Sequence, residues 1–330
     1  MSTKAHRFLV VLAAIIILFS VALIALTLGH TPPRQPLPDP NGFDDFVKAG
    51  HVVSRSAWYS PDLDHDGLRA LMSTNAEALR LLRVGLTRQC SVPTESVVTN
   101  FSEMMYDLRN MRRLAGLLVQ EGRLKEMENR PADAALSYVA LVQFGNETSK
   151  GGVIENRTTG IYCEDLGYFP LANLVSKLDC DQARPVLHAL RRIEISRVTW
   201  DEVRRNDRRF VRHEFAHATS PLAWLKGLRE IRQLEVYHKQ SLSRVSLLTA
   251  ELALRCYRSE QKNVPVRLDD LVPKYLARVP EDPFTGKPLI YRPQGTNWML
   301  YSCGSDGVDN GGKPVRQGSA NGDIFFDSPL

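Results

Sequence analysis

The chain has 330 residues, of which 43% are hydrophobic and 24% are charged. This composition is typical of a folded globular protein and excludes a disordered chain. Its formal net charge of +5 is nearly accounted for by residues 184–232, where twelve Lys and Arg stand against six Asp and Glu. This basic segment predicts a solvated helical face, with binding to anionic lipid or to an acidic partner as the alternative. The sequence contains no nucleotide-binding glycine motif and no hydrolase elbow, and it indicates neither a nucleic-acid partner nor a small-molecule substrate.

The first element in the chain is an apolar segment from Phe8 to Leu28 that contains no charged residue. At ~1.5 Å per residue it is long enough to cross a hydrocarbon core of ~30 Å. It predicts a transmembrane helix that is retained; a cleaved signal peptide is the alternative, although its apolar run is normally shorter. Lys4 and Arg7 precede the segment and acidic residues follow it. The positive-inside bias therefore places residues 1–7 in the cytoplasm and the rest of the chain outside.

A Pro-rich linker is expected over residues 29–66, because five prolines between 31 and 40 favour an extended spacer. An irregular α-helical domain follows over 67–219, where apolar residues recur near the helical period. Its expected helices span 67–86, 96–128, 132–144, 154–166, 170–178, 181–193 and 199–215.

The end of the linker is acidic. Asp62, Asp64, Asp66 and Gly67 match the first positions of an EF-hand loop, which binds calcium through oxygen ligands. Position 12 of that loop is Ser73, so the bidentate glutamate is missing. The segment predicts an acidic turn whose Asp64 or Asp66 caps the next helix, with a weak calcium site as the alternative.

The helices 96–128 and 132–144 resemble one tetratricopeptide unit. Gly122, Ala134 and Tyr138 keep the small, small and aromatic offsets that allow two helices to pack closely. Because three or more units are normally required for a solenoid, we expect a single pair of this style within an irregular body.

A zinc motif is present by pattern at the end of helix 199–215. His213 and His217 stand four residues apart and share one helix face, and Glu214 is placed to polarise a metal-bound water. A third ligand would come from Glu230 or Glu235. Three arginines crowd His213, and cations oppose the binding of a dication. We expect a solvated helix end here, with a membrane-anchored zinc metalloprotease that uses Glu214 as the alternative.

The region 220–330 opens with a long helix. Ser220 followed by Pro221 is typical of an N-cap and a first helical position, and the apolar stripe continues to about Glu260 without a proline. A helix of this length measures roughly 60 Å.

Five cysteines are scattered along the chain, at Cys90, Cys163, Cys180, Cys256 and Cys303. No C-x-x-C pair is present, so neither a zinc ribbon nor a thioredoxin-type site is indicated. An oxidising compartment permits disulfides, but the odd count leaves one thiol unpaired and the spacing does not reveal the pairing.

The residues after the long helix carry the most specific pattern in the chain. The segments 268–276, 280–288, 289–292, 298–302 and 323–326 resemble the C-terminal part of the major pseudopilin of type II secretion. The resemblance covers about residues 245–326. It implies a small α+β end with a short antiparallel sheet, and a location at the bacterial cytoplasmic membrane.

The resemblance also implies a calcium site in the loop that precedes the last segment. Asp306 and Asp323 match the family's ligand pattern, and Ser305 and Asp309 are their neighbours. Hard Ca²⁺ prefers such oxygen ligands on a flexible backbone. The alternative is that Asp and Gly simply form turns here.

Taken together, the sequence predicts a mainly α protein with a single N-terminal transmembrane helix, an irregular helical body, and a long helix leading into a small pseudopilin-like α+β domain. We expect an extracytoplasmic structural or interaction protein that is anchored at the inner membrane, with calcium as its cofactor. Neither a reaction nor a particular protein partner is indicated.

Overall fold

The computed structural model describes residues 36–93, 101–214, 221–315 and 321–327, with side chains described outside 211–229. The predicted transmembrane segment 8–28 lies outside these residues. Within the described part, no helix is both long enough and apolar enough to cross a membrane.

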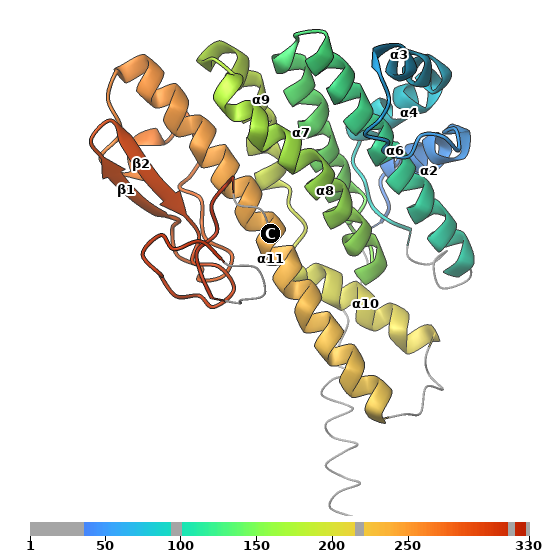
Figure 1. Cartoon of the computed structure of the whole chain (residues 1–330). Helices are drawn as coiled ribbons and strands as arrows, with labels where there is room; N and C mark the ends of the chain where they lie inside the picture. Colours follow the sequence, from blue (N-terminus) through green and yellow to red (C-terminus); the bar gives the residue numbers. More distant parts are fainter. Residues whose placement is uncertain (1–35, 94–100, 215–220, 316–320, 328–330) are drawn as a thin grey trace, which may run out of the picture. The chain divides into compact units, whose positions relative to one another are not determined.

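The described part is mainly helical, as expected, with a small antiparallel sheet near its C-terminus (Figure 1). In chain order its elements are α2 (Gly42–Val52), α3 (His65–Thr74), α4 (Ala76–Leu86), α6 (Phe101–Met127), α7 (Pro131–Glu147), α8 (Ile154–Leu174), η1 (Val175–Lys177), α9 (Cys180–Ile195), α10 (Trp200–Glu214), α11 (Pro221–Gln261), η2 (Leu268–Leu271), β1 (Ile290–Gln294) and β2 (Asn297–Tyr301).

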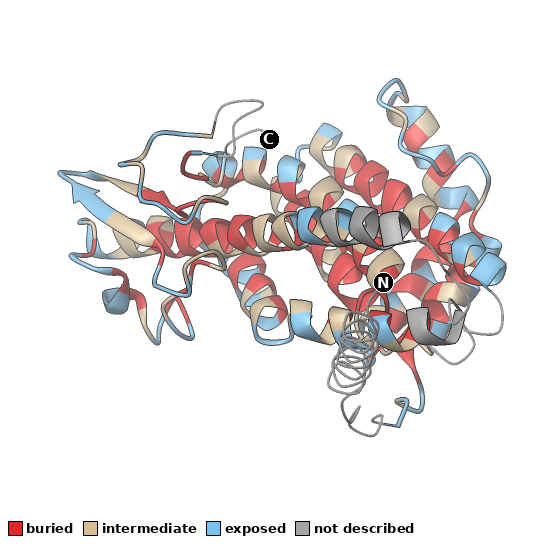
Figure 2. Cartoon of the chain, turned by 90° about the horizontal axis from the view of Figure 1, so that it is seen from below, coloured by how far each residue is buried: buried red, intermediate tan, exposed pale blue. Residues whose placement is uncertain are grey.

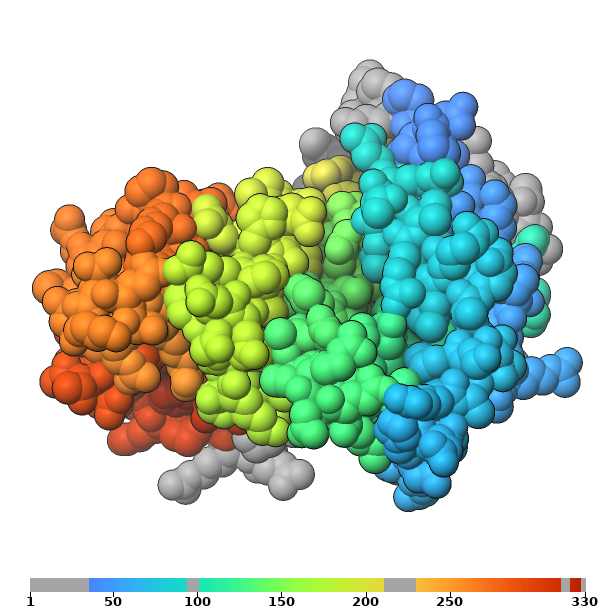
Figure 3. Space-filling model, turned by 90° about the horizontal axis from the view of Figure 1, so that it is seen from above, coloured from blue at the N-terminus to red at the C-terminus, as the bar shows by residue number. Residues whose placement is uncertain are grey.

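Two layers of helices organise the middle of the chain. In one layer α8 lies between α6 and α11, and in the other α7 packs beside α9. α7 contacts both α6 and α8, so it closes the groove between them. On the face seen in Figure 3, successive segments abut one another in chain order. Because α8 contacts both α6 and α11, this layer joins three helices that are not consecutive in the chain.

The folded body begins earlier than the sequence suggests. α2 lies inside the range 29–66, for which a Pro-rich linker was expected, and buries Phe43 and Phe46. The two glycines Gly42 and Gly85 let α2 approach α4 closely, because a Cβ at Gly85 would lie 2.5 Å from the Phe46 ring. The five prolines between residues 31 and 40 favour an extended linker, and the composition of this region therefore does not indicate the short helix that follows.

Two further helices differ from their expected limits. The helix expected over 67–86 is divided into α3 and α4 at Asn75, whose side chain accepts a hydrogen bond from the Ser54 amide at 2.7 Å. The helices expected over 154–166 and 170–178 are instead one helix, α8, with Pro170 inside it. A proline removes one backbone hydrogen bond, but Leu171 is fully buried just after it and keeps the helix in place.

The α6–α7 pair has the close packing expected from Gly122 and Tyr138. A Cβ added at Gly122 would lie 2.2 Å from Cε1 of Tyr138, so only glycine fits against this ring. Tyr138 is completely buried, and its hydroxyl donates to Glu126 Oε1 at 2.6 Å. Ala134 is also buried in this contact region.

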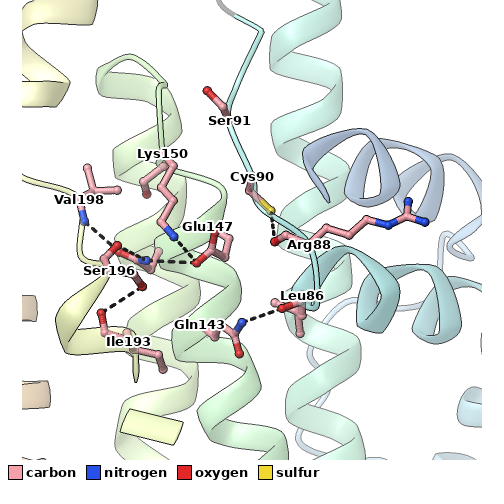
Figure 4. A network of polar contacts seen from close by, with 12 residues as sticks. Leu86, Arg88, Cys90, Ser91, Gln143, Glu147, Lys150, Ile193, Ser196 and Val198 are labelled. Carbon is pink, nitrogen blue, oxygen red and sulfur yellow. Dashed lines mark hydrogen bonds and ion pairs between the residues drawn. The ribbon is translucent and has the colours of Figure 1, made fainter. Parts of the chain in front are cut away.

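The C-terminal end of α7 ties two connecting segments to the helical body (Figure 4). Gln143 donates to the carbonyl of Leu86 at 2.9 Å, at the end of α4. The Asn146 side chain accepts from the Val198 amide at 3.1 Å and donates to the Ser196 carbonyl at 3.2 Å, in the link between α9 and α10. These bonds satisfy backbone groups that would otherwise be buried without partners.

α11 is the helix on which the other elements of the C-terminal half pack. Figure 2 shows that its burial is concentrated in its C-terminal part, and Val245, Leu248 and Leu252 there are almost fully buried. One side of this part packs against α8 and α9, and the other side meets the sheet through Leu300 and Ile324. The buried part of α11 also carries polar residues, among them Thr249 and Glu251.

The sheet is a single hairpin. β1 and β2 pair antiparallel from Ile290 opposite Tyr301 to Gln294 opposite Asn297. Gly295 has a φ of 63°, which the tight turn between the strands requires. The Trp298 indole donates to Glu251 of α11 at 2.8 Å, which fixes the hairpin on the helix.

Candidate functional site

The predicted calcium loop is folded around hydrogen bonds. Asp323 is fully buried, and its two carboxylate oxygens accept from the backbone amides of Asn310 at 3.2 Å and Gly312 at 2.7 Å. Burial raises the pKa of Asp323. Asp306 accepts from the Val308 amide at 3.1 Å. Each of these carboxylates is thus directed at donors that the loop itself supplies.

Asp309 is the link between this loop and the sheet. Its carboxylate accepts from the Tyr301 hydroxyl at 2.7 Å, from the Gly311 amide at 2.8 Å and from Arg292 at 2.6 Å. These hydrogen bonds, that from Tyr301 first, lower the pKa of Asp309. Arg292 provides the positive charge that a cation would otherwise bring to this carboxylate.

No group of three or more His, Cys, Asp or Glu in the described part is arranged to hold a metal ion. Asp306, Asp309 and Asp323 are satisfied by amide, hydroxyl and guanidinium donors. Ser305 has a partner as well. Calcium at this loop therefore remains a prediction that follows from the resemblance, and its test is given in the Discussion.

The acidic turn at residues 62–67 serves as a helix cap. Asp64 is the N-cap of α3, and its Oδ1 accepts from the Gly67 amide at 2.8 Å. Asp66 lies in the first turn of the helix, where a negative charge is favourable. Of the two caps that the sequence allows, the structure selects Asp64.

The zinc motif falls mostly outside what the structure describes. His213 and Glu214 are in the last turn of α10, but their side chains are not among those described, and His217 lies in 215–220. The proposed third ligand Glu235 forms an ion pair with Lys239 at 3.1 Å, and Glu230 is exposed.

The outward face of α8 carries a row of residues that the sequence analysis did not single out. Tyr162, Asp165 and Phe169 are spaced three and four residues apart, so they lie on one face of the helix. Tyr162 is 38% exposed and Phe169 is 40% exposed. Both rings are thus partly open to solvent on one face of the helix.

On one side of this row, α6 contributes an arginine. The Arg112 guanidinium lies 5.5 Å from the centre of the Tyr162 ring, and its NH2 group donates to Thr159 at 3.5 Å. The Nε atom of Arg112 is buried and has no hydrogen-bond partner among the described residues. Met105, two turns earlier on the same face of α6, is 41% exposed.

On the other side, α11 contributes a second arginine in the same way. Arg244 lies 5.0 Å from the centre of the Phe169 ring and forms an ion pair with Asp165 at 2.5 Å. Burial raises the pKa of Asp165, and Arg244 opposes that rise. Tyr237, two turns earlier on α11, is 46% exposed. The exposed and half-buried side chains of the three helices form what we call the arginine–aromatic face: Met105, Arg112, Tyr162, Phe169 and Tyr237, with the buried Arg244 beside Phe169.

α10 already covers one end of this layer. The Phe210 ring stacks on Phe101 at the start of α6 with centroids 6.1 Å apart. Trp200 lies 5.6 Å from the His238 ring of α11, and α10 also contacts α8. A helix can therefore lie across α6, α8 and α11, and the arginine–aromatic face continues the layer beyond it.

A buried ionic centre fixes α8 to α11 beneath the face. Arg157 is fully buried and binds Glu164 through two bonds of 2.6 and 2.9 Å. Its Nε donates to Nδ1 of His238 at 2.9 Å, and Ser241 donates to Glu164. Burial, reinforced by the Arg157 charge, lowers the pKa of His238 to about 3, so this ring is neutral and accepts the bond.

Comparisons with protein-family models, with curated proteins and with solved structures find no match to this chain.

Sequence reasoning missed the arginine–aromatic face because its members come from three separate helices. The pattern of Tyr162 and Phe169 at a spacing of seven was visible in the sequence. Aromatic residues at helical spacing usually indicate core, however, and only the fold shows that these two face outward.

Proposed function

We propose that this chain is a membrane-anchored extracytoplasmic interaction protein whose arginine–aromatic face binds an acidic helical segment of a partner protein. Anchoring rests on the apolar segment 8–28, and location outside the bacterial cytoplasmic membrane rests on the pseudopilin resemblance of residues 245–326. The observation that carries the binding proposal is the pair of Arg–aromatic contacts that line the two edges of α8.

The chemistry of the face supports a protein partner. Tyr and Arg are enriched among the residues that contribute most to protein interfaces, and Tyr162 with Arg112 combines both. An arginine also pairs well with a carboxylate, since its planar group can form two parallel bonds. Arg112 has no ion pair with a carboxylate in the described residues, whereas Arg244 already has Asp165. Arg109, one turn before Arg112, is exposed and adds a second positive charge.

The helical form of the partner is supported by α10. This helix lies across the same layer and uses aromatic contacts with Phe101 and His238. A second helix laid beside it would place apolar side chains on Tyr162 and Phe169 and acidic side chains near Arg112. Recognition of this kind, in which the apolar side of an amphipathic helix packs on a helical surface, is common in peptide binding.

Site-specific photo-crosslinking in cells tests this proposal. Benzoylphenylalanine placed at Tyr162 or Phe169 is expected to crosslink one common partner through an acidic segment. The same probe at Tyr59, an exposed aromatic beside Arg123 rather than on the face, is the matched control. Arg112→Glu should abolish the crosslink at position 162, and a Glu→Arg change in the partner segment should restore it. Equal crosslinking from all three positions would overturn the proposal.

A further inference from the structure

Two of the five cysteines lie side by side in the folded chain. Cys180 is the first residue of α9, and Cys256 lies near the end of α11. The Cys256 sulfur is 3.8 Å from the carbonyl oxygen of Cys180. Burial raises the pKa of Cys256 to about 12. Both cysteines line the same cavity.

A cavity connects this pair to the surface. It has a volume of about 290 Å³ and is lined by both cysteines together with Val175, Leu178 and Leu252. Cys180 is half-buried, whereas Cys256 is 1% exposed. A small disulfide can therefore reach the Cys180 thiol first, because the Cys256 thiol is shielded from solvent.

The rim of the cavity is charged. Glu260 accepts from Arg184 at 2.7 Å, and the Cys180 thiol lies 3.7 Å from the same carboxylate oxygen. A hydrogen bond with the Cys180 side chain raises the pKa of Arg184. The positive charge of Arg184 suits a reagent that carries carboxylates, such as oxidised glutathione.

The other cysteines have different surroundings. Cys90 follows α4, and its thiol donates to the carbonyls of Gly85 and Arg88, each at 3.7 Å. Cys163 is buried inside α8, and Cys303 follows β2 beside Asp282. Among the described residues, Cys180 and Cys256 are thus the pair that the contacts bring together.

We propose that Cys180 and Cys256 form a disulfide by exchange with a small glutathione-type disulfide, and that this bond locks α9 to α11. The Cys180 thiolate attacks one glutathione sulfur, which forms a mixed disulfide and releases glutathione. Cys256 then loses its proton to water in the cavity and attacks the Cys180 sulfur, which releases the second glutathione. The two cysteines lose two electrons and two protons in total, and one oxidised glutathione becomes two reduced molecules.

The bond joins residues that are far apart in sequence, so it restricts the unfolded chain strongly. It also holds the start of α9 against the part of α11 that supports the sheet. This inference concerns the pairing alone and is independent of the proposed partner.

The full-length chain, purified in detergent under reducing conditions, is treated with oxidised glutathione and is then unfolded in guanidinium that contains N-ethylmaleimide, so that the buried thiols react as well. We expect the intact mass to show the loss of two hydrogen atoms and the addition of three maleimides. Peptide mapping should find one crosslinked pair, Cys180 with Cys256. The melting temperature should rise by several degrees and fall back after reduction.

The single variants define the route. Cys256→Ser should stop at a stable mixed disulfide between Cys180 and glutathione, while Cys180→Ser should gain neither glutathione nor a crosslink at Cys256. Cys90→Ser is the matched control and should still form the bond. Five maleimides on the treated wild-type chain, or a different crosslinked pair in the native protein, would overturn the proposal.

Discussion

The buried residue His238 makes the stability of the folded chain depend on pH. Its neutral ring accepts from Arg157, and burial lowers its pKa to about 3 from the usual 6.5. The charged groups around it are Arg157, Glu164, Arg197 and Lys239. Because the folded pKa is lower than the unfolded one, the unfolded chain takes up a proton first as the pH falls. Stability is therefore lost from about pH 6.5 down to about pH 3.

His238→Gln removes this titration but keeps an acceptor for Arg157. The wild-type chain should lose about 2 kcal/mol more free energy of unfolding than the variant between pH 7 and pH 5. Urea denaturation at both pH values measures the difference. The control is His188→Gln on the exposed side of α9, which should retain the wild-type dependence. Parallel curves for wild type and His238→Gln would show that His238 is not held neutral.

Pairs of elements, rather than single residues, account for the rigidity of the body. α6 and α7 meet where Gly122 faces Tyr138, and a Cβ would lie 2.2 Å from the ring. Gly122→Ala should therefore lower the free energy of unfolding by about 1–3 kcal/mol, as overpacking does. Met127→Ala, at the exposed end of α6, should change it by less than about 0.5 kcal/mol. Similar denaturation midpoints for the two variants would contradict the close contact.

The terminal loop is the second element whose stability can be tested. Asp309 joins it to the sheet through Tyr301 and Arg292. If hydrogen bonds within the protein alone hold the loop, Asp309→Ala lowers the melting temperature by a similar amount in chelator and in millimolar calcium. Asp269→Asn, at an exposed position of η2, is a control outside the loop.

A calcium-dependent loop would behave differently. Wild type would melt several degrees higher in calcium than in chelator, since a ligand that binds only the folded state adds RT ln(1 + [L]/Kd). Asp309→Ala would then lose that increment in addition to the stability lost with the hydrogen bonds that Asp309 accepts from Tyr301 and Arg292. The same set of melting curves thus distinguishes hydrogen bonds within the loop from calcium.

Sequence patterns predicted the elements that have a strong local signal. α11, with Pro221 at its first turn, is close to its expected limits, and the short antiparallel sheet expected near the C-terminus is present. α2 was missed because Pro-rich neighbours dominate its composition, although Phe43 and Phe46 anchor it in the core. The break at Asn75 was missed because the apolar stripe continues across it. In each case a tertiary contact outweighs the local pattern.

At the scale of the whole described chain, the fold brings together what the sequence separates. Arg112 meets Tyr162, and Arg244 meets Phe169, only because α8 lies between α6 and α11. α8 has a buried side that carries the Arg157–Glu164 pair, and Tyr162 and Phe169 of the same helix are exposed. A site of this kind has no motif, so it cannot be read from residue spacing.

The most direct test measures binding to the arginine–aromatic face by fluorescence anisotropy. The probe is a labelled amphipathic helical peptide with leucines on one side and glutamates on the other. We expect binding that weakens with salt and that falls about tenfold or more for Tyr162→Ala, as for an interface residue worth at least ~1.4 kcal/mol. Tyr59→Ala should bind like wild type, and anionic lipid vesicles should not compete. Equal affinities of wild type and Tyr162→Ala, or displacement of the peptide by the vesicles, would contradict the assignment of this face to an acidic protein partner.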